Sequence, residues 1–320
     1  MNANVLKLDC ARAVDEISAA LQENILRRFR KKGVVLGLSG GIDSSIVAAL
    51  AVRALGRERV LGLLMPERDS AAETLPLSQQ IAGHLGIETV HEDITGILEA
   101  TGCYRRRDEA IRLVVPEFGA NWKSKIVLPG VLTGDQFRLF SVVVQSPEGQ
   151  RTEAKLSLPA FLGIVAASNF KQRTRKMLEY YHADRLNFAV AGTPNRLEYD
   201  QGFFVKLGDG AADIKPIAHL YKTQVYQLAE FLQLPEVIRN RPPTTDTYSL
   251  PQSQEEFYFS VPYDKMDLIL YAKNHNVSAA DVCGAVGLTA EQVERVFKDI
   301  EAKRRVAAYL HAPPVVLCAE

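Results

Sequence analysis

Hydrophobic residues recur along this chain in runs whose spacing changes between helical and extended periods. From Ala11 to Lys32 the apolar positions have a helical spacing, and a basic last turn leads to Gly33, which ends the predicted helix. The apolar run over 34–38 predicts a buried strand. The same pattern continues with strands over 60–65 and 89–94 and helices over 44–55 and 71–85. This alternation predicts an α/β fold with a doubly wound parallel sheet and helices on both of its faces.

Between residues 103 and 160 the apolar residues no longer have a helical spacing. Short apolar runs alternate there with turn sequences that contain Pro, Gly, Asp and Ser, and they predict strands over 125–128, 137–145 and 152–158. We interpret 103–160 as a β-rich insertion within a single domain that spans residues 1–320. Further elements are predicted after it, namely a helix over 171–185, a strand over 187–191, a helix over 219–232 and helices from 263 onward, with Ser278 and Thr289 as caps and Gly287 as a stop.

Composition narrows the class of partner. Lys plus Arg and Asp plus Glu number 38 each, so no charge excess favours nucleic acid or an anionic membrane surface. The N-terminal stretch carries charges where a signal peptide is apolar, and no apolar run approaches the roughly 20 residues of a membrane helix. The four cysteines are scattered without a C-x-x-C pair, which argues against a zinc site and a disulfide framework. We expect a cytoplasmic protein with a small charged ligand, and neither nucleic acid nor membrane as its partner.

The strongest chemical signal is the sequence Gly-Leu-Ser-Gly-Gly-Ile-Asp-Ser-Ser over 37–45, between a predicted strand and a predicted helix. Its glycines permit a tight turn, its hydroxyls donate hydrogen bonds, and the helix N-terminus directs N–H groups at an anion. It lacks the lysine of a Walker loop and the spacing of a dinucleotide fingerprint. Asp43 beside phosphates would repel them unless Mg²⁺ bridges the two. The pattern predicts a pyrophosphate site with a metal; the alternative is a plain turn that caps the helix.

At these residues the chain resembles the N-type ATP pyrophosphatases, whose S-G-G-x-D-S-S loop binds the phosphates of ATP. Segments 191–198, 202–216 and 220–225 then follow in the order typical of NAD synthetases. Segments 169–175 and 243–246 resemble that family's N-x-K-x-R-x-R helix and Pro-Thr-Ala-Asp sequence. The resemblance implies an adenine nucleotide alpha hydrolase-like, Rossmann-like fold. It also implies a C–N ligase in which ATP drives the amidation of deamido-NAD by ammonia through an acyl adenylate, releasing AMP and pyrophosphate.

The family pattern also implies roles for single residues of this chain. Asp43 and Glu198 are expected to bind Mg²⁺, and Asp43 and Lys222 to act in catalysis. The residues expected at ATP are Gly37, Ser39, Gly40, Gly41, Ile42, Asp43, Ser44, Thr193, Lys222 and Thr244. Those expected at deamido-NAD are Arg173, Lys206, Asp213 and Lys303. Taken singly, Glu198 or Lys206 would more simply be an exposed surface charge, and only their place in ordered motifs favours binding.

The chain departs from the family pattern at three places. Gly-Thr-Pro-Asn over 192–195 stands where many bacterial members read Gly-Thr-Asp-His, and Ala302-Lys303 replaces the family's His-Lys pair. The β-rich insertion has no counterpart that the resemblance places. The sequence contains no nitrilase-like arrangement of Glu, Lys and Cys, so the nitrogen is expected from free ammonia or from a separate glutaminase. NAD synthetases of this size are similar in being homodimers, so the resemblance implies that this chain also forms a homodimer.

Two other functions stay open on the sequence. The first is an amide ligase that adenylates another carboxylate. The second is a non-catalytic nucleotide-binding module, against which the joint presence of Asp43, Glu198, Lys206 and Lys222 argues. A tRNA-modifying role ranks behind both, because neither a basic face nor an RNA-binding appendage is evident.

Overall fold

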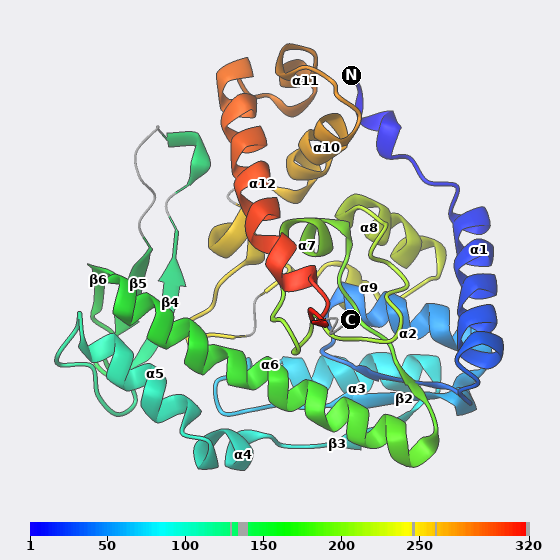
Figure 1. Cartoon of the computed structure of the whole chain (residues 1–320), viewed down its shortest axis with the longest axis horizontal. Coiled ribbons are helices and arrows are strands. Elements are labelled where there is room, and N and C mark those ends of the chain that lie inside the picture. Colours follow the sequence, from blue (N-terminus) through cyan, green and yellow to red (C-terminus); the bar gives the residue numbers. More distant parts are fainter. Residues whose placement is uncertain (129, 134–139, 245–246, 260, 318–320) are drawn as a thin grey trace.

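The fold is built on a four-stranded parallel sheet with helices on both sides (Figure 1). The computed structural model describes residues 1–128, 130–133, 140–244, 247–259 and 261–317. Its strands are β1 (Val34–Gly37), β2 (Val60–Leu64), β3 (Glu88–His91), β4 (Lys123–Val127), β5 (Ser141–Gln145), β6 (Arg151–Lys155) and β7 (Ala189–Val190). Its helices are α1 (Cys10–Gln22), α2 (Ile42–Leu55), α3 (Thr74–Leu85), α4 (Thr95–Ala100), α5 (Cys103–Arg112), α6 (Leu158–Leu186), α7 (Arg196–Gln201), α8 (Lys222–Phe231), α9 (Glu236–Arg239), α10 (Tyr263–Asn274), α11 (Ala279–Val286) and α12 (Ala290–His311). Single turns of other helix types lie at Ala3–Leu6, Glu23–Arg28, Arg57–Arg59, Val131–Thr133 and Glu255–Phe259.

The parallel sheet has the strand order β3-β2-β1-β7. Strand β1 is central, because Val34 is in register with Val60 of β2 on one side and with Ala189 of β7 on the other. The chain winds outward from β1 to β3 and returns to the other side of β1 only at β7. The order therefore reverses between β1 and β7, and ligands of open α/β sheets bind at such a point, beyond the carboxyl ends of the strands.

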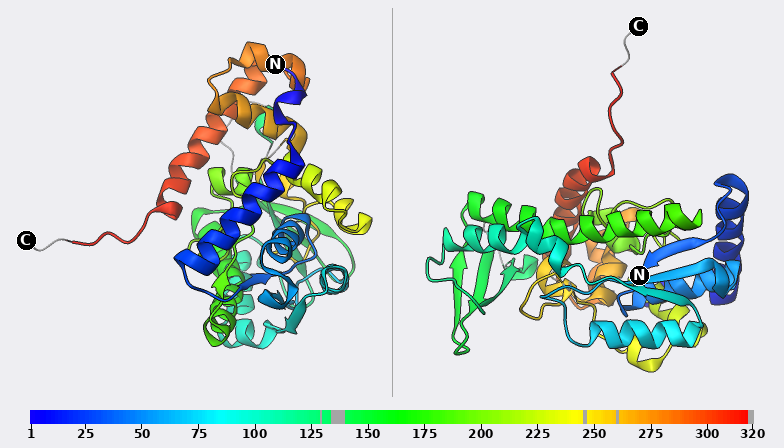
Figure 2. Two further views of the ribbon diagram at one scale, coloured as in Figure 1. Left: turned by 90° about the vertical axis from the view of Figure 1, so that its right-hand side faces the viewer. Right: turned by 90° about the horizontal axis from the view of Figure 1, so that it is seen from below.

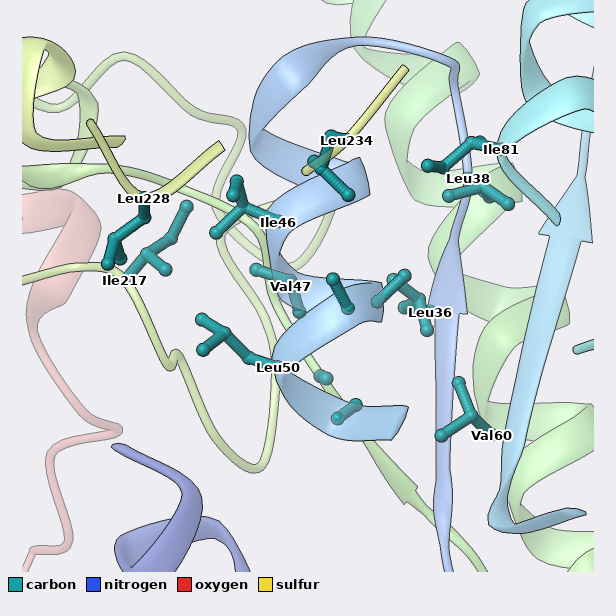
Figure 3. Packing of buried hydrophobic residues seen from close by; sticks show 14 of the residues in the cluster. Leu36, Leu38, Ile46, Val47, Leu50, Val60, Ile81, Ile217, Leu228 and Leu234 are labelled. Atoms are coloured by element: carbon teal, nitrogen blue, oxygen red, sulfur yellow. The ribbon is translucent and has the colours of Figure 1, made fainter. Parts of the chain in front are cut away.

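Alternate residues of the buried strands supply two separate cores. Val34 and Leu36 pack with α1, α2, α3, α8 and α9, and Figure 3 shows Leu36 facing Val47 of α2. Val35 points to the opposite face, where it packs with residues of α4, α5 and α6. Because successive side chains of a strand point to opposite faces, an almost continuous apolar run is what a sheet covered on both sides requires. The predicted α/β class and its two helical layers are confirmed.

The segment predicted to be a β-rich insertion differs from the prediction at both ends. Its first ten residues form α5, which packs along α6. Leu158, assigned to a strand, is instead the first residue of α6, where Ser157 caps the helix by accepting a hydrogen bond from the N–H of Ala160. The β-rich prediction was wrong over 103–112 because this helix is rich in arginine, and Arg107 stands in the middle of the buried face that Cys103, Tyr104, Ala110 and Ile111 otherwise form. Strands β4, β5 and β6 overlap the three predicted strands and pair as an antiparallel sheet, while residues 137–139 lie outside the described residues.

The C-terminal helices α10, α11 and α12 pack on each other and on Leu197 and Tyr221. Ser278 and Thr289 cap α11 and α12, and Gly287 ends α11 in the left-handed region, as predicted. Beyond α12 the chain runs away from the body (Figure 2). Within the described part of the chain, no helix joins the length and the apolar character needed to cross a membrane.

Candidate active site

The loop between β1 and α2 lies at the carboxyl end of the central strand. Gly40 has a positive φ of 68°, and a Cβ there would lie 2.6 Å from the Cβ of Leu77 on α3, so only glycine fits. The Ser39 hydroxyl accepts a hydrogen bond from the N–H of Gly41 at 3.3 Å. Helix α2 begins after Gly41 without a side-chain cap. Its first N–H groups are therefore directed at the space beyond the sheet, where an anion would be stabilised.

Asp43 on the first turn of α2 is the centre of a polar cluster. Its carboxylate forms a short ion pair with Lys222 at the start of α8, whose side chain is 0% exposed. Its other oxygen accepts a hydrogen bond from Asn195 Nδ2 at 3.2 Å. Burial alone would lower the pKa of Lys222, but Asp43 and Glu198 more than offset burial, and the pKa is raised. Lys222 therefore keeps its proton at neutral pH and holds an ammonium at the phosphate loop.

Glu198 on α7 is the second carboxylate of this cluster. It is 8% exposed and accepts a hydrogen bond from the backbone N–H of Asn195 at 3.1 Å. Burial raises the pKa of Glu198 to about 8, Asp43 adds to the rise, and Lys222 opposes it. When Glu198 is ionised, two carboxylates face a single ammonium. A divalent cation would neutralise the excess, and Mg²⁺ is commonly held by one or two carboxylates together with substrate phosphates, so the donor set fits Mg²⁺.

These groups line a cavity of about 570 Å³ beyond the carboxyl ends of β1 and β2. The residues predicted at ATP or Mg²⁺ that line it are Gly37, Ser39, Gly41, Ile42, Asp43, Ser44, Thr193, Glu198, Lys222 and Thr244. Gly40 instead packs behind the loop against α3. Thr244 is paired with Ser253 by an isolated antiparallel bridge, while Thr245 and Asp246 of the predicted segment lie outside the described residues. In the described part of the chain, no three Asp, Glu, His or Cys side chains gather as a ready ligand set.

The residues predicted at deamido-NAD do not line this cavity. Arg173 on α6 is exposed, and its Nε donates to the carbonyl of Lys206 at 3.3 Å. The ammonium of Lys206 donates to the carbonyls of Tyr309 and Ala312, at 2.8 Å and 3.0 Å, where α12 ends. These contacts place Arg173 and Lys206 together on an outer surface beside the C-terminal end of α12.

Asp213 and Lys303 each hydrogen-bond to the backbone of a neighbouring segment. Asp213 accepts a hydrogen bond from the N–H of Val190 at 2.7 Å, which braces the end of β7. Lys303 on α12 is 9% exposed, donates to the carbonyl of Tyr258 at 2.6 Å and pairs with Asp299 at 2.6 Å. In this arrangement Asp213 supports the edge of the sheet, and Lys303 ties α12 to the segment around Tyr258.

The sequence interpretation missed two residues that organise the cavity. Asn195 is fully buried and contacts both Asp43 and Glu198. It donates from its side-chain amide to Asp43, and it caps α7 in a reciprocal capping box with Glu198. The spacing Asn-x-x-Glu at 195–198 is the signal that predicts such a box. Arg241 donates to the carbonyl of Ser39 at 3.2 Å and to the hydroxyl of Thr74 at 3.1 Å. No local pattern marks Arg241, since it lies 202 residues away from the loop that it contacts.

A buried ion network fixes the segment after β2 beside this cavity. Lys171 of α6 is 1% exposed, and its ammonium lies 2.8 Å from Glu67 and 2.9 Å from Asp69. Arg107 of α5 contacts the same oxygen of Asp69 at 2.5 Å, and the Tyr104 hydroxyl donates to Glu67 at 2.8 Å. Burial alone would raise the pKa of Asp69, but the two cations more than offset it, and the pKa is lowered. The network thus joins three elements through paired charges.

The parallel sheet, the glycine loop after its first strand and the carboxylate–lysine cluster together define an α/β nucleotide-binding protein with a phosphate loop. The family model described as NAD synthase matches residues 13–124 and 149–307. The NH(3)-dependent NAD(+) synthetase of Mesorhizobium japonicum is 58% identical over 312 residues, covering 98% of this chain and 98% of its own length. The enzyme of the same name from Thermotoga maritima is 36% identical over 282 residues, covering 86% and 90%. This chain belongs to the NAD synthase family.

Solved structures agree in fold. The NH3-dependent NAD synthetase from Campylobacter jejuni has a TM-score of 0.64 at 24% identity and covers 97% of this chain and 100% of its own. The NMN synthetase from Francisella tularensis has a TM-score of 0.68 at 21% identity and covers 97% and 99%. The chain thus shares its overall fold with these two proteins.

Proposed function

We propose that this chain is a ligase that uses ATP to convert deamido-NAD and ammonia into NAD, AMP and pyrophosphate. The observation that carries the proposal is the cluster of Asp43, Lys222 and Glu198 at the phosphate loop, in a cavity of about 570 Å³. The substrate pair is supported by relatives named NH(3)-dependent NAD(+) synthetase. They favour deamido-NAD over another carboxylate. The cluster favours turnover over mere nucleotide binding, because a binder has no use for two carboxylates beside the phosphates.

The reaction starts from a nicotinate carboxylate, which is a poor electrophile until it is activated. Its oxygen attacks the α-phosphorus of ATP, and pyrophosphate leaves; ammonia then attacks the acyl carbon and displaces AMP. The loop N–H groups and the Lys222 ammonium stabilise the negative charge that develops on the phosphates. Such a donor is worth about 3 to 4 kcal/mol of transition-state stabilisation. The remaining contribution of the protein is to hold the two substrates in line.

Asp43 and Glu198 are the residues that would hold Mg²⁺. When bound, the ion neutralises phosphate charge that these two carboxylates would otherwise repel. Asn195 holds both side chains in place by donating to Asp43 from its amide and to Glu198 from its backbone. Arg241, which also lines the cavity, adds a further positive charge beside the loop.

Deamido-NAD would reach this cavity from the surface that carries Arg173 and Lys206, with Asp213 and Lys303 supporting its edges. The neighbouring part of α6 exposes Met177 and Tyr181 to 56% and 59%. Exposed apolar side chains beside charged groups are typical of a surface that a second subunit covers. A homodimer with substrate bound near that surface follows from the same proposal.

The nitrogen donor is proposed to be ammonia, either free or delivered by a separate glutaminase. The relatives that support this are named for NH3 as donor. A cytoplasmic location belongs to the same proposal, and nucleic acid and membrane have no part in it.

The direct test incubates the purified protein with ATP, Mg²⁺, an ammonium salt and deamido-NAD, and measures NAD and AMP together. We expect equal amounts of both, and none with Asp43→Ala, because that change removes one proposed metal ligand and the partner of Lys222. Glutamine in place of ammonium should give no product. If ATP binds but deamido-NAD yields no NAD, the substrate assignment is wrong, and nicotinate mononucleotide and other carboxylates are then tested in the same assay.

Glu198→Gln should change how stability depends on pH. A carboxyl group whose pKa rises from 4.5 to about 8 on folding binds more protons in the folded state. Without Mg²⁺ it therefore makes the wild type less stable as pH increases through this window, by a few kcal/mol at most. The glutamine variant keeps the oxygen that accepts from Asn195 but cannot ionise, so its thermal midpoint should lose this slope.

Mg²⁺ with ATP should counteract the slope, because cation binding requires ionised Glu198. We expect the stabilisation of the wild type by Mg²⁺ and ATP to grow between about pH 6 and about pH 8, and that of the variant to stay flat. Equal pH slopes in the two proteins would show that Glu198 does not titrate in this window.

A further inference from the structure

The free edge of β4 is covered by a distant segment of the chain, residues 249–252. The N–H of Ser124 donates to the Ser249 hydroxyl at 2.9 Å, and the carbonyl of Ser124 accepts from the N–H of Leu250 at 3.2 Å. The next outward-pointing carbonyl of β4, that of Ile126, accepts from Gln252 Nε2 at 2.5 Å. Alternate residues of a strand direct their backbone groups to the same side, so this segment occupies the edge that β5 leaves open.

The covered edge continues directly into the cavity. Ser253 follows Gln252 and forms the antiparallel bridge with Thr244, which lines the cavity. Tyr248, at the other end of the segment, is 8% exposed and packs among apolar residues of β4 and β5, including Ile126 and Val142. Tyr248 also lines the cavity. The segment is therefore held on the antiparallel sheet by Tyr248 on one side and by Gln252 on the other. It reaches the cavity through Tyr248 and through the bridge from Ser253 to Thr244.

Two further contacts strengthen this connection. The Lys171 ammonium, already paired with acidic residues, donates to the carbonyl of Thr247 at 2.8 Å. Phe140, which precedes β5, stacks on Phe161 of α6 at a centroid distance of 4.3 Å, and both rings line the cavity. Phe140, next to β5, thus lines the cavity, while β4 holds the segment that follows Tyr248.

The family model leaves residues 125–148 unmatched, and these contain most of β4 and all of β5. These two strands thus lie largely outside the part of the chain that the family model matches, whereas β6 lies within it. Phe140 and Tyr248, which adjoin or pack on the antiparallel sheet, line the cavity.

We propose that the antiparallel sheet β4-β5-β6 is a positioning element, which holds residues 247–253 and through them Thr244 in the arrangement that binds ATP. The proposal rests on the proposed function in one respect, namely that ATP is the ligand of the cavity. Its physical basis is preorganisation: a segment already paired along a strand edge does not have to be ordered when the nucleotide binds. Ser249 and Gln252 are positioning residues in this scheme, since they act on the nucleotide through Ser253 and Thr244.

The test uses the double variant Ser249→Ala/Gln252→Ala in the full chain, which removes two side-chain hydrogen bonds from the β4 edge. The matched control is Thr152→Ala/Glu153→Ala on β6, where both side chains are exposed. Hydrogen exchange is followed in peptides covering 247–259 and 141–155. ATP affinity is measured by titration calorimetry with Mg²⁺. A third variant, Ser249→Thr with Gln252 intact, keeps the hydroxyl and should behave as the wild type.

We expect exchange over 247–259 to become roughly ten-fold faster in the double variant, with 141–155 unchanged, and ATP to bind roughly ten-fold more weakly. The control should stay within about two-fold in both measurements. Unchanged exchange over 247–259, or faster exchange with unchanged ATP affinity, would overturn the proposal. Because neither measurement needs product formation, a wild type that binds ATP without making NAD would refute the proposed function while these measurements still decide this inference.

Discussion

Replacing Lys222 with methionine is expected to lower kcat for NAD formation by about two to three orders of magnitude, the loss seen when one well-placed charge-stabilising donor is removed. The side chain is 0% exposed and is paired with Asp43 at the phosphate loop. Methionine has a similar length but no charge, so the cavity keeps its shape. The variant leaves Asp43 and Glu198 facing each other without a cation, so Mg²⁺ should bind there more tightly, and the remaining activity should be saturated at a lower Mg²⁺ concentration than in the wild type.

The control for this experiment is Lys273→Met on α10, which removes an ammonium that pairs with Glu301 away from the cavity. Its kcat should match that of the wild type. Steady-state rates and urea unfolding are measured on the same samples, so that loss of fold is distinguished from loss of chemistry. A Lys222→Met protein that is folded and retains kcat within about three-fold would mean that Lys222 serves only as the counter-ion of Asp43.

Lys171→Met should produce the largest loss of stability, about 3 to 5 kcal/mol in the free energy of unfolding. The substitution leaves Glu67 and Asp69 buried with one cation fewer, and an uncompensated buried charge is costly. Asp69 has a lowered pKa, so its contribution to stability is present above the ordinary carboxyl value near 4 and is lost as pH falls further. Removing Lys171 weakens that contribution. The variant should therefore unfold at a higher pH in an acid titration, besides unfolding at lower urea.

The matched control is Lys298→Met on α12, whose side chain is exposed. A surface change of this kind is expected to stay within about 0.5 kcal/mol of the wild type. If Lys171→Met also stayed within that range, the buried network would have to be dispensable for folding, and the segment after β2 would be held by apolar packing alone.

The architecture was largely predictable, because its main elements are marked by local patterns. The strand at 34–37 is a fully apolar run ended by glycine, and the caps at Ser278 and Thr289 follow short-range rules. The sequence failed where burial uses polar or charged side chains. Helix α5 hides Arg107 against Asp69, so its buried face carries a charge that reads as exposed in the sequence. The β-rich prediction over 103–112 failed for that reason.

Only those site residues that belong to contiguous sequence motifs could be predicted. The phosphate loop and Glu198 could be named from ordered sequence patterns, and the structure brings both to one cavity with Lys222. Arg241 could not be named, since its contact with Ser39 joins segments 202 residues apart and depends on tertiary packing alone. The roles of Arg173, Lys206, Asp213 and Lys303 stay predictions that rest on the family pattern.

Because β1 lies in the centre of the sheet, the sheet and the site beside it can be completed only late in synthesis. Its neighbour β7 and the partner of Asp43 are made late, for Lys222 follows Asp43 by 179 residues. At about 5 to 20 residues per second, a ribosome needs on the order of ten to forty seconds to cover that interval. Throughout it, the nascent chain carries a phosphate loop without its lysine, and until β7 is made the edge of β1 is also open. The complete Asp43–Lys222 pair can therefore form only after Lys222 has left the ribosome.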